Sequence, residues 1–128
     1  MARSAVLDSS AILAAIFNEP GDDLVLPLLE GGLLSAVNLA EVHTRLLLRG
    51  AGTDFAWRRI MDFGCEICFF DDQLARLAAE LIAQTRPYGL SLGDRACLAL
   101  ALQRKATAYT TDAAWKNLNL GIDVQVIR

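Results

Sequence analysis

Positive charge is scarce in this sequence, because 12 Lys and Arg residues stand against 15 Asp and Glu residues, for a formal net charge of -3. A protein that holds nucleic acid by its bulk charge carries a surplus of Lys and Arg. The composition therefore excludes binding of nucleic acid by bulk charge alone. A polyanionic substrate would need a local basic patch, a bound cation, or both.

Cysteine is also scarce, and the thiols of Cys65, Cys68 and Cys97 are odd in number. This count does not suggest a disulfide framework and favours a reducing compartment. Cys65 and Cys68 have the spacing of half a zinc site, but the stretch CEICFFD alternates like a strand and puts them on opposite faces. A tetrahedral site needs four ligands, and only Cys97 and His43 remain elsewhere, so zinc is not expected.

Long uncharged apolar runs are missing too. None approaches the ~20 residues that span a bilayer, and Asp8 interrupts the stretch near the N-terminus that a signal peptide would keep apolar. A cytoplasmic protein without a membrane partner is expected. The 128 residues are 54% hydrophobic, which predicts a single domain over residues 1–128 with a sizeable core and apolar surface left for a partner.

Short strand-like runs alternate with longer stretches of helical periodicity along the chain. Strands are predicted at 4–8, 33–37, 65–71, 106–112 and 123–127. Helices are predicted at 9–17, 22–30, 38–49, 53–63, 72–86 and 91–105. This alternation predicts an α/β fold, a central and mostly parallel sheet of about five strands flanked by helices on both faces. Such sheets bind ligands at the carboxyl ends of their strands, near a topological switch point.

Acidic residues occupy that predicted edge of the sheet. Asp8 directly follows the apolar run SAVL, and Asp112 ends the stretch ATAYTTD. Glu41 and Asp94 fall in the first turns of two predicted helices. Carboxylates this close together repel one another and raise one another's pKa. A hard divalent cation such as Mg²⁺ or Mn²⁺ would relieve the repulsion, since both prefer oxygen ligands.

A simpler interpretation is helix capping. Each acid has a capping alternative, with Asp8 and Asp112 as N-caps and the pairs Asn38–Glu41 and Ser91–Asp94 as capping boxes. Capping does not require four acids at one edge of a sheet. It also does not explain the hydroxyls of the Ser9-Ser10 and Thr110-Thr111 pairs, which suit contacts with phosphate or with metal-bound water. The two interpretations are compatible, because an acid in a first turn can cap and still face a cleft.

Four motifs together resemble the PIN-domain nucleases, in particular the VapC-type toxins of toxin–antitoxin modules. They are VLDSSAIL (6–13), SAVNLAEV (35–42), LSLGDRACLALA (90–101) and AYTTDAAW (108–115), in the order typical of that family and over nearly the whole chain. By this resemblance the catalytic, metal-binding acids of the family correspond to Asp8, Glu41, Asp94 and Asp112, and its conserved hydroxyls to Ser10 and Thr110. Many relatives carry a further acid after the last aspartate, whereas this chain has Ala113, Ala114 and Asn117 there, which puts a second metal in doubt.

The resemblance implies a PIN-like fold and a metal-dependent endoribonuclease, the toxin of a type II toxin–antitoxin module. Asp8, Glu41 and Asp94 would form the core of an Mg²⁺ or Mn²⁺ site, with Asp112 bound directly or through water. RNA would be the substrate. A cognate antitoxin would lay an extended tail along apolar grooves, and homodimers are expected. Residues 24–34, LVLPLLEGGLL, are a candidate for such a groove, with a place in the core as the equal alternative.

Substrate phosphates need cations besides the metal. Arg95, next to Asp94, is the nearest candidate in sequence, with a plain surface charge as the alternative. The other candidates are Arg45, Arg49, Arg58, Arg59, Arg86 and Arg104, of which Arg58 and Arg59 are expected to lie on a solvated helix face. Trp57, Tyr88 and Trp115 are candidates for stacking on bases, although a place partly in the core is the favoured alternative for each. His43 lies two residues from Glu41 on the same predicted helix, so it points to another face and is expected to pack rather than react.

Three other functions are consistent with parts of the pattern. A receiver-type phosphorylation switch would need an acidic pair after the first strand, and Asp8 has no acidic neighbour. A haloacid-dehalogenase phosphatase would need an aspartate two residues after Asp8, where Ser10 stands. A catalytically silent PIN-like binding scaffold would have lost acids, whereas all four are present.

Overall fold

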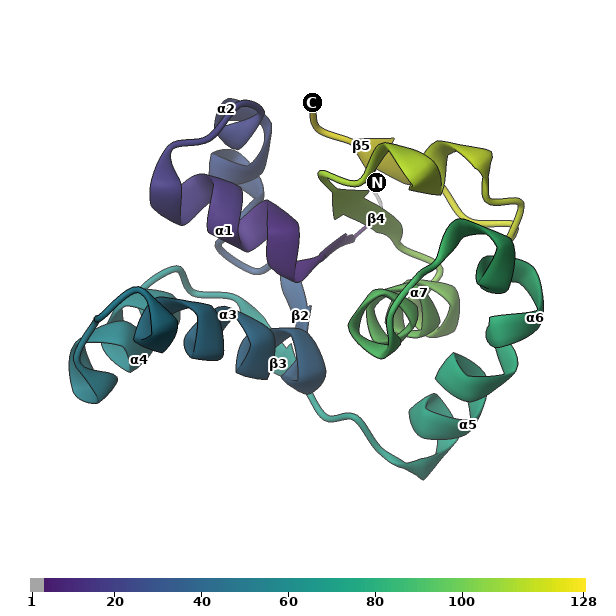
Figure 1. Cartoon of the computed structure of the whole chain (residues 1–128), viewed down its shortest axis with the longest axis horizontal. Helices are drawn as coiled ribbons and strands as arrows, with labels where there is room; N and C mark the ends of the chain where they lie inside the picture. Colours follow the sequence, from purple (N-terminus) through teal and green to yellow (C-terminus); the bar gives the residue numbers. More distant parts are fainter. Residues whose placement is uncertain (1–3) are drawn as a thin grey trace.

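The computed structural model describes residues 4–128, so residues 1–3 of the predicted domain lie outside the described range. Its centre is one sheet of five parallel strands in the order β3-β2-β1-β4-β5. The strands are β1 (Ala5–Leu7), β2 (Leu33–Ser35), β3 (Glu66–Cys68), β4 (Thr107–Thr110) and β5 (Val124–Val126). The predicted α/β fold with a parallel five-stranded sheet is confirmed (Figure 1).

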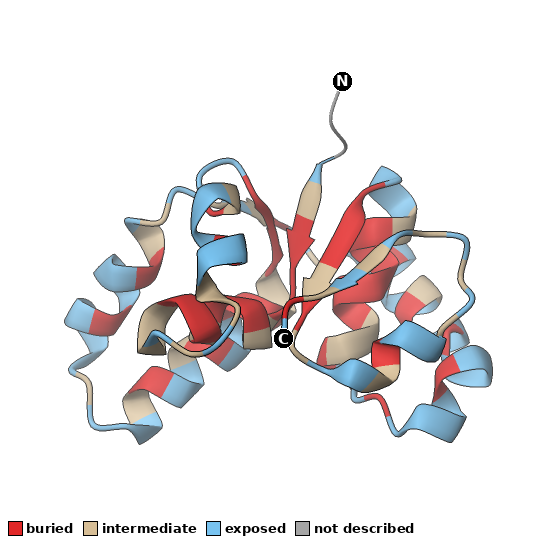
Figure 2. Ribbon diagram, turned by 90° about the horizontal axis from the view of Figure 1, so that it is seen from above, coloured by how far each residue is buried: buried red, intermediate tan, exposed pale blue. Residues whose placement is uncertain are grey.

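Helices cover both faces of the sheet, which lies between them in Figure 2. One layer holds α1 (Ser9–Phe17), α2 (Asp22–Val25), the 3-10 turn η1 (Leu26–Leu28), α3 (Ala36–Leu48) and α4 (Thr53–Met61). The other holds α5 (Asp72–Glu80), α6 (Ile82–Thr85), η2 (Arg86–Tyr88), α7 (Leu92–Arg104) and η3 (Ala113–Asn117). Within residues 4–128, every helix is too short or too polar to cross a bilayer.

Alternation along the strands builds two separate cores. Val6 and Leu33 face the core on the α5–α7 side, while their neighbours Leu7 and Leu34 face the core on the α1–α4 side. A strand that is buried on both faces has a continuous apolar sequence, which explains the run AVL before Asp8. Cys65 and Cys68 pack on opposite sides in the same way, as predicted, and are unbonded thiols.

The order of the strands creates a switch point between β1 and β4. From β1 the chain moves outward through β2 to β3, and then returns to β4 on the other side of β1. The helix that follows β1 packs in the α1–α4 layer, whereas Trp115 of η3, which follows β4, packs in the α5–α7 layer. The connections therefore leave the carboxyl ends of β1 and β4 in opposite directions, which is where an open α/β sheet binds its ligand.

Some predicted boundaries are wrong. Strand β2 ends at Ser35 rather than at residue 37, and the Ser35 hydroxyl caps α3 by accepting a hydrogen bond from the backbone N of Val37 at 3.2 Å. The predicted cap, Asn38, is instead the third residue inside the helix. The predicted helix over 22–30 changes to a 3-10 turn at Leu26, next to Pro27, whose nitrogen cannot donate to a helical ladder.

The predicted helix over 72–86 also divides, into α5 and α6 at Leu81. The buried hydroxyl of Thr85 donates to the Leu81 carbonyl at 2.9 Å, a type of side-chain bond that bends helices. The helix predicted from Ser91 onward begins where it was expected, with Ser91 as its N-cap.

Candidate active site at the switch point

Asp8 lies at the carboxyl end of β1, with only 3% of its surface exposed. Its backbone has the extended conformation of an N-cap, but its side chain caps nothing in α1. One carboxylate oxygen, Oδ2, accepts hydrogen bonds from the Ser10 hydroxyl at 2.5 Å and from the Thr110 hydroxyl at 3.0 Å. The capping interpretation of Asp8 is therefore wrong for its side chain, which is oriented toward the end of β4.

The other carboxylate oxygen of Asp8, Oδ1, is buried and has no hydrogen-bond partner within residues 4–128. Burial raises the pKa of Asp8 to about 6, although Ser10 and Thr110 stabilise its ionised form. The charges of Asp94 and Glu41 add to that rise. A buried carboxylate with one unpartnered oxygen is costly by itself, and a bound cation or a proton would offset the cost.

Ser10 and Thr110 also tie the end of β4 to the start of α1. The backbone N of Thr111 donates to the Ser10 hydroxyl at 3.0 Å, and the backbone N of Asp112 donates to the Thr110 hydroxyl at 3.1 Å. Each hydroxyl thus accepts from the loop after β4 while it donates to Asp8. This arrangement fixes Asp8 relative to Asp112.

Glu41 reaches the same region from α3, where α3 passes the start of α7. The buried amide of Asn38 donates to Glu41 Oε1 at 2.9 Å and to the Gly93 carbonyl at 3.0 Å. Gly93 has no side chain, and a Cβ at that position would overlap the Glu41 carboxylate. Asn38 and Gly93 together therefore decide where this carboxylate lies.

The sequence alone does not predict these roles of the two residues. It favours Asn38 as a helix cap and assigns no role to Gly93. One available signal is that a helix contains a glycine at all, because glycine is a poor helix former and its presence in a helix often has a packing reason.

Asp94 and Asp112 combine capping with proximity to the other acids. Asp94 and Ser91 form the predicted capping box, in which Asp94 Oδ2 accepts from the backbone N of Ser91 at 2.9 Å. Burial raises the pKa of Asp94, and the charges of Asp112 and Glu41 raise it further. Asp112 is exposed and caps η3, accepting from the backbone N of Ala114 at 3.0 Å.

The four predicted acids thus form one electrostatic cluster, contributed by the ends of β1 and β4 and by α3 and α7. The buried thiol of Cys97 lies beside it, since the charges of Asp8, Asp94 and Glu41 add to the effect of burial in raising its pKa well above the ordinary value. The residues are not a preformed cage, because no three Asp, Glu, His or Cys side chains within residues 4–128 are placed to hold one ion directly.

The donor set nevertheless fits a hard divalent cation. All four side chains offer carboxylate oxygens, and Asp8 Oδ1 is buried without another partner among residues 4–128. Mg²⁺ keeps several waters and is usually bound through one or two carboxylates, so it does not need three converging protein ligands. Asp8 is therefore the residue best suited to direct coordination, with the other acids available through water.

Other predicted contacts lie elsewhere. Arg95 donates from Nη1 to the Ala78 carbonyl of α5 at 2.9 Å, so the geometry gives no support to a phosphate contact by this side chain. Trp115 is completely buried and cannot stack on a base. His43 packs edge-on against Trp57 with ring centroids 5.4 Å apart, in agreement with its predicted packing role.

Comparisons with known proteins place this geometry in a family. A family model, the PIN domain, matches residues 5–119. The fold is similar to that of a chain in DNA-bound VapBC from Salmonella typhimurium, with a TM-score of 0.74, 17% sequence identity and 98% of each chain covered.

It is also similar to a chain of FitAcB from Neisseria gonorrhoeae (TM-score 0.68, 24% identity, 94% of this chain and 96% of that chain). A chain of a toxin–antitoxin complex from Klebsiella pneumoniae is similar too (TM-score 0.68, 16% identity, 89% and 92%). A comparison with curated protein sequences gives no match. Because the family model spans nearly all of the described residues, from β1 to beyond η3, the chain belongs to the PIN-domain family.

Proposed function

We propose that this protein is an endoribonuclease that depends on Mg²⁺ or Mn²⁺ and that serves as the toxin of a type II toxin–antitoxin module. The observation that carries the proposal is the buried Oδ1 of Asp8 at the switch point of the sheet, which has no partner among residues 4–128, with Glu41, Asp94 and Asp112 close enough to act on one another electrostatically. Binding of a cation there would remove both the desolvation cost and the repulsion.

In this proposal each residue of the site has a separate role in holding the cation or in orienting its ligands. Asp8 would hold the cation through Oδ1, while Ser10 and Thr110 hold its other oxygen and so fix the orientation of the carboxylate. Glu41, held by Asn38, and the half-buried Asp94 would offer further carboxylate oxygens to the cation or to its waters, and Asp112 lies at the exposed rim of the site. When bound, such a cation supplies an activated water and stabilises charge on the scissile phosphate.

The decisive experiment compares wild-type protein with Asp8→Asn on a single-stranded RNA, in Mg²⁺, in Mn²⁺ and in EDTA. Wild-type protein is expected to cleave with either ion and to stop in EDTA. Asp8→Asn should lose about 100-fold or more in rate, because the charge stabilisation that a metal ion supplies is worth several kcal/mol. Asp62→Asn, an equal loss of charge at an exposed position on the far end of α4, is the matched control and should cleave normally.

Cleavage by Asp8→Asn at the wild-type rate would refute the assignment of Asp8. A wild-type protein that folds but cleaves nothing with either ion would instead favour the silent binding scaffold.

An antitoxin partner is the second part of the proposal. It is supported by the likeness in fold to chains of VapBC and of a toxin–antitoxin complex. Residues 24–34 suit an antitoxin-binding groove only in part, since Leu24 and Leu26 are about half exposed whereas Val25, Leu29 and Leu34 are core residues.

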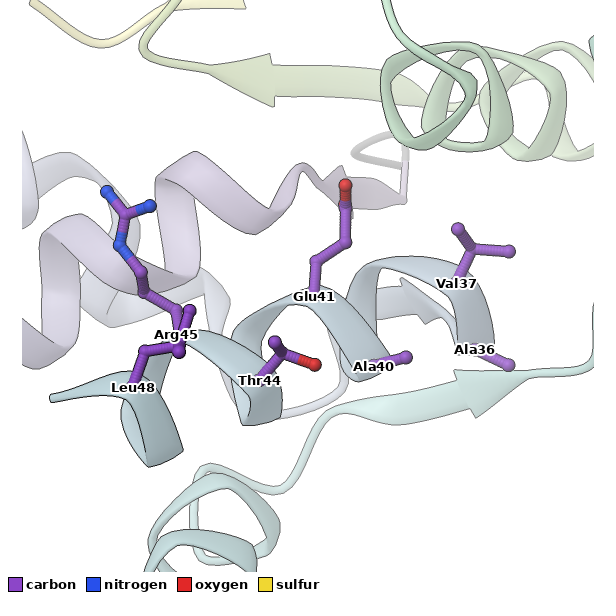
Figure 3. A pocket seen from close by; sticks show the side chains of 7 residues that line it. All are labelled: Ala36, Val37, Ala40, Glu41, Thr44, Arg45 and Leu48. Carbon is purple, nitrogen blue, oxygen red and sulfur yellow. The ribbon is translucent and has the colours of Figure 1, made fainter. Parts of the chain in front are cut away.

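A groove of about 650 Å³ along α3 is a better candidate for the docking site of the antitoxin. It is lined by apolar Ala36, Val37, Ala40 and Leu48 and has Glu41 on its rim (Figure 3).

The test of the partner begins with a neighbouring reading frame that encodes a short DNA-binding protein. Co-expression of that protein with this one should give a complex that co-purifies and in which the nuclease is inhibited. Leu48→Asp should weaken that complex, because Leu48 is 79% exposed in the groove and carries no core packing to lose. A complex that forms equally well with Leu48→Asp would exclude this groove as the docking site.

A further inference from the structure

A second, basic cleft opens beside the acidic cluster. Its volume is about 190 Å³, and its lining includes Ser10, Thr111 and the arginines Arg45, Arg49 and Arg128. Ser10 is shared between the two sites, because its hydroxyl donates to Asp8 Oδ2 and the residue also lines this cleft. An occupant of the cleft that contacts Ser10 is therefore next to the residue that holds the Asp8 carboxylate of the proposed active site.

The positive charge in this cleft exceeds the negative charge. Glu19 is the one acid in the lining, and Arg128 pairs with it at 3.4 Å. No carboxylate within residues 4–128 lies within 4.0 Å of Arg45 or Arg49. In a protein with a formal net charge of -3, two uncompensated guanidinium groups in one cleft are a local reversal of sign.

Arg45 and Glu41, although neighbours on α3, do not form an ion pair within residues 4–128. Arg45 lies four residues after Glu41 on α3, a spacing that normally favours an ion pair, and both side chains project from the same side of the helix (Figure 3). The Glu41 carboxylate is instead held by Asn38. Arg49 is positioned by its own contact, with its guanidinium carbon 4.5 Å from the centroid of the Phe17 ring.

We propose that this cleft binds a backbone phosphate of the RNA strand, next to the phosphate that is cut. This inference rests on the proposed function, since it names how the same site would hold its substrate. Arginine suits the role because its planar fork can bind two phosphate oxygens at once. The hydroxyl of Thr111 adds a neutral donor of the kind that commonly binds phosphates, whereas the one hydroxyl hydrogen of Ser10 is already donated to Asp8. An acidic peptide would satisfy the same charges, but the shared Ser10 favours a strand that continues into the acidic cluster.

The test measures binding and cleavage separately. Binding of a fluorescently labelled single-stranded RNA is followed by anisotropy in EDTA, with wild-type protein, the double variant Arg45→Gln/Arg49→Gln and the control Arg58→Gln/Arg59→Gln. The control removes the same charge from the exposed face of α4. Thermal melts confirm that all three proteins fold.

Neutralising the two cleft arginines is expected to weaken RNA binding about 10-fold. It should also lower the slope of log affinity against log salt by about 0.7, because each neutralised phosphate on a single strand adds about 0.7 to that slope and the cleft is proposed to hold one phosphate. The control should change affinity by less than about twofold. With Mn²⁺ present, the cleft variant should raise KM about 10-fold with kcat within about twofold, because the acids remain intact.

Equal RNA affinity in wild type and the cleft variant, or an equal weakening in the control, would overturn the inference even if the protein cleaves RNA. Binding through the cleft without any cleavage would instead refute the proposed nuclease and leave the cleft assignment standing. A polyglutamate of matched charge is the third arm. If it binds as tightly as RNA and is weakened equally in the cleft variant, the cleft accepts acidic peptides and the RNA assignment is wrong.

Discussion

At the scale of single residues, Asp8 is a position where folding disfavours a charge. The unfolded chain ionises an aspartate near pH 4, whereas burial raises the pKa of Asp8 to about 6 in the folded chain. Between these values the folded state binds more protons than the unfolded state, so the free energy of unfolding falls as the pH rises. For this one residue the decrease amounts to about 3 kcal/mol.

The predicted consequence concerns metal-free protein. In EDTA, the free energy of unfolding of the wild type, measured by urea denaturation, should decrease from pH 4 to pH 7. Asp8→Asn cannot ionise, so it should lose most of this decrease and unfold at a higher urea concentration than the wild type at pH 7. Parallel pH profiles for the two proteins would contradict the burial of a charged carboxylate at this position.

At the scale of secondary-structure elements, α3 and α7 approach closely at Gly93, where the absence of a side chain leaves room for the Glu41 carboxylate. A methyl group at Gly93 would overlap the Glu41 carboxylate, which is the end of a flexible side chain and can move away. Gly93→Ala should therefore fold, helped by the better helix propensity of alanine, worth about 1 kcal/mol. Its nuclease activity should fall about 10- to 100-fold, because the methyl group displaces the Glu41 carboxylate, which is proposed to support the bound cation.

Gly52→Ala is the matched control for that prediction. Gly52 precedes α4 with a φ of -66° and has open space where a Cβ would lie, so the substitution should leave activity unchanged. Melting temperatures check folding, and cleavage rates in Mn²⁺ check activity. Full activity in Gly93→Ala would mean that the position of Glu41 does not matter for catalysis.

The same two helices show what could be predicted from the sequence and what could not. The start of α7 was predictable, because Ser91 and Asp94 form a capping box that only nearby residues determine. The start of α3 was not, because Ser35 and Asn38 are both good cap residues and local sequence does not say where β2 ends. The choice depends on the contact of Asn38 with Gly93, 55 residues later in the chain.

At the scale of the whole molecule, the sheet separates two cores, and the acidic cluster joins them. Alternation along the strands was predictable from the sequence. So was the gathering of the four acids, whose charges act on one another. The basic cleft was not predictable, because Arg45 and Arg49 are two candidates among many until α3, α1 and the loop after β4 come together around Ser10. Arg95, the best candidate by sequence distance, is held instead by the Ala78 carbonyl.

Because the acids come from both layers, a cation bound among them should increase the free energy of unfolding of the whole domain. A ligand that binds only the folded state at 100 times its dissociation constant adds about 2.7 kcal/mol to the free energy of unfolding. For a domain of this size that corresponds to a rise in Tm of about 10 °C. We expect Mn²⁺ to produce such a rise in wild-type protein and in Asp62→Asn, and a much smaller rise in Asp8→Asn, as measured by differential scanning calorimetry. An equal rise in all three proteins would mean that the ion binds away from Asp8, because a site anchored on that carboxylate cannot survive its neutralisation.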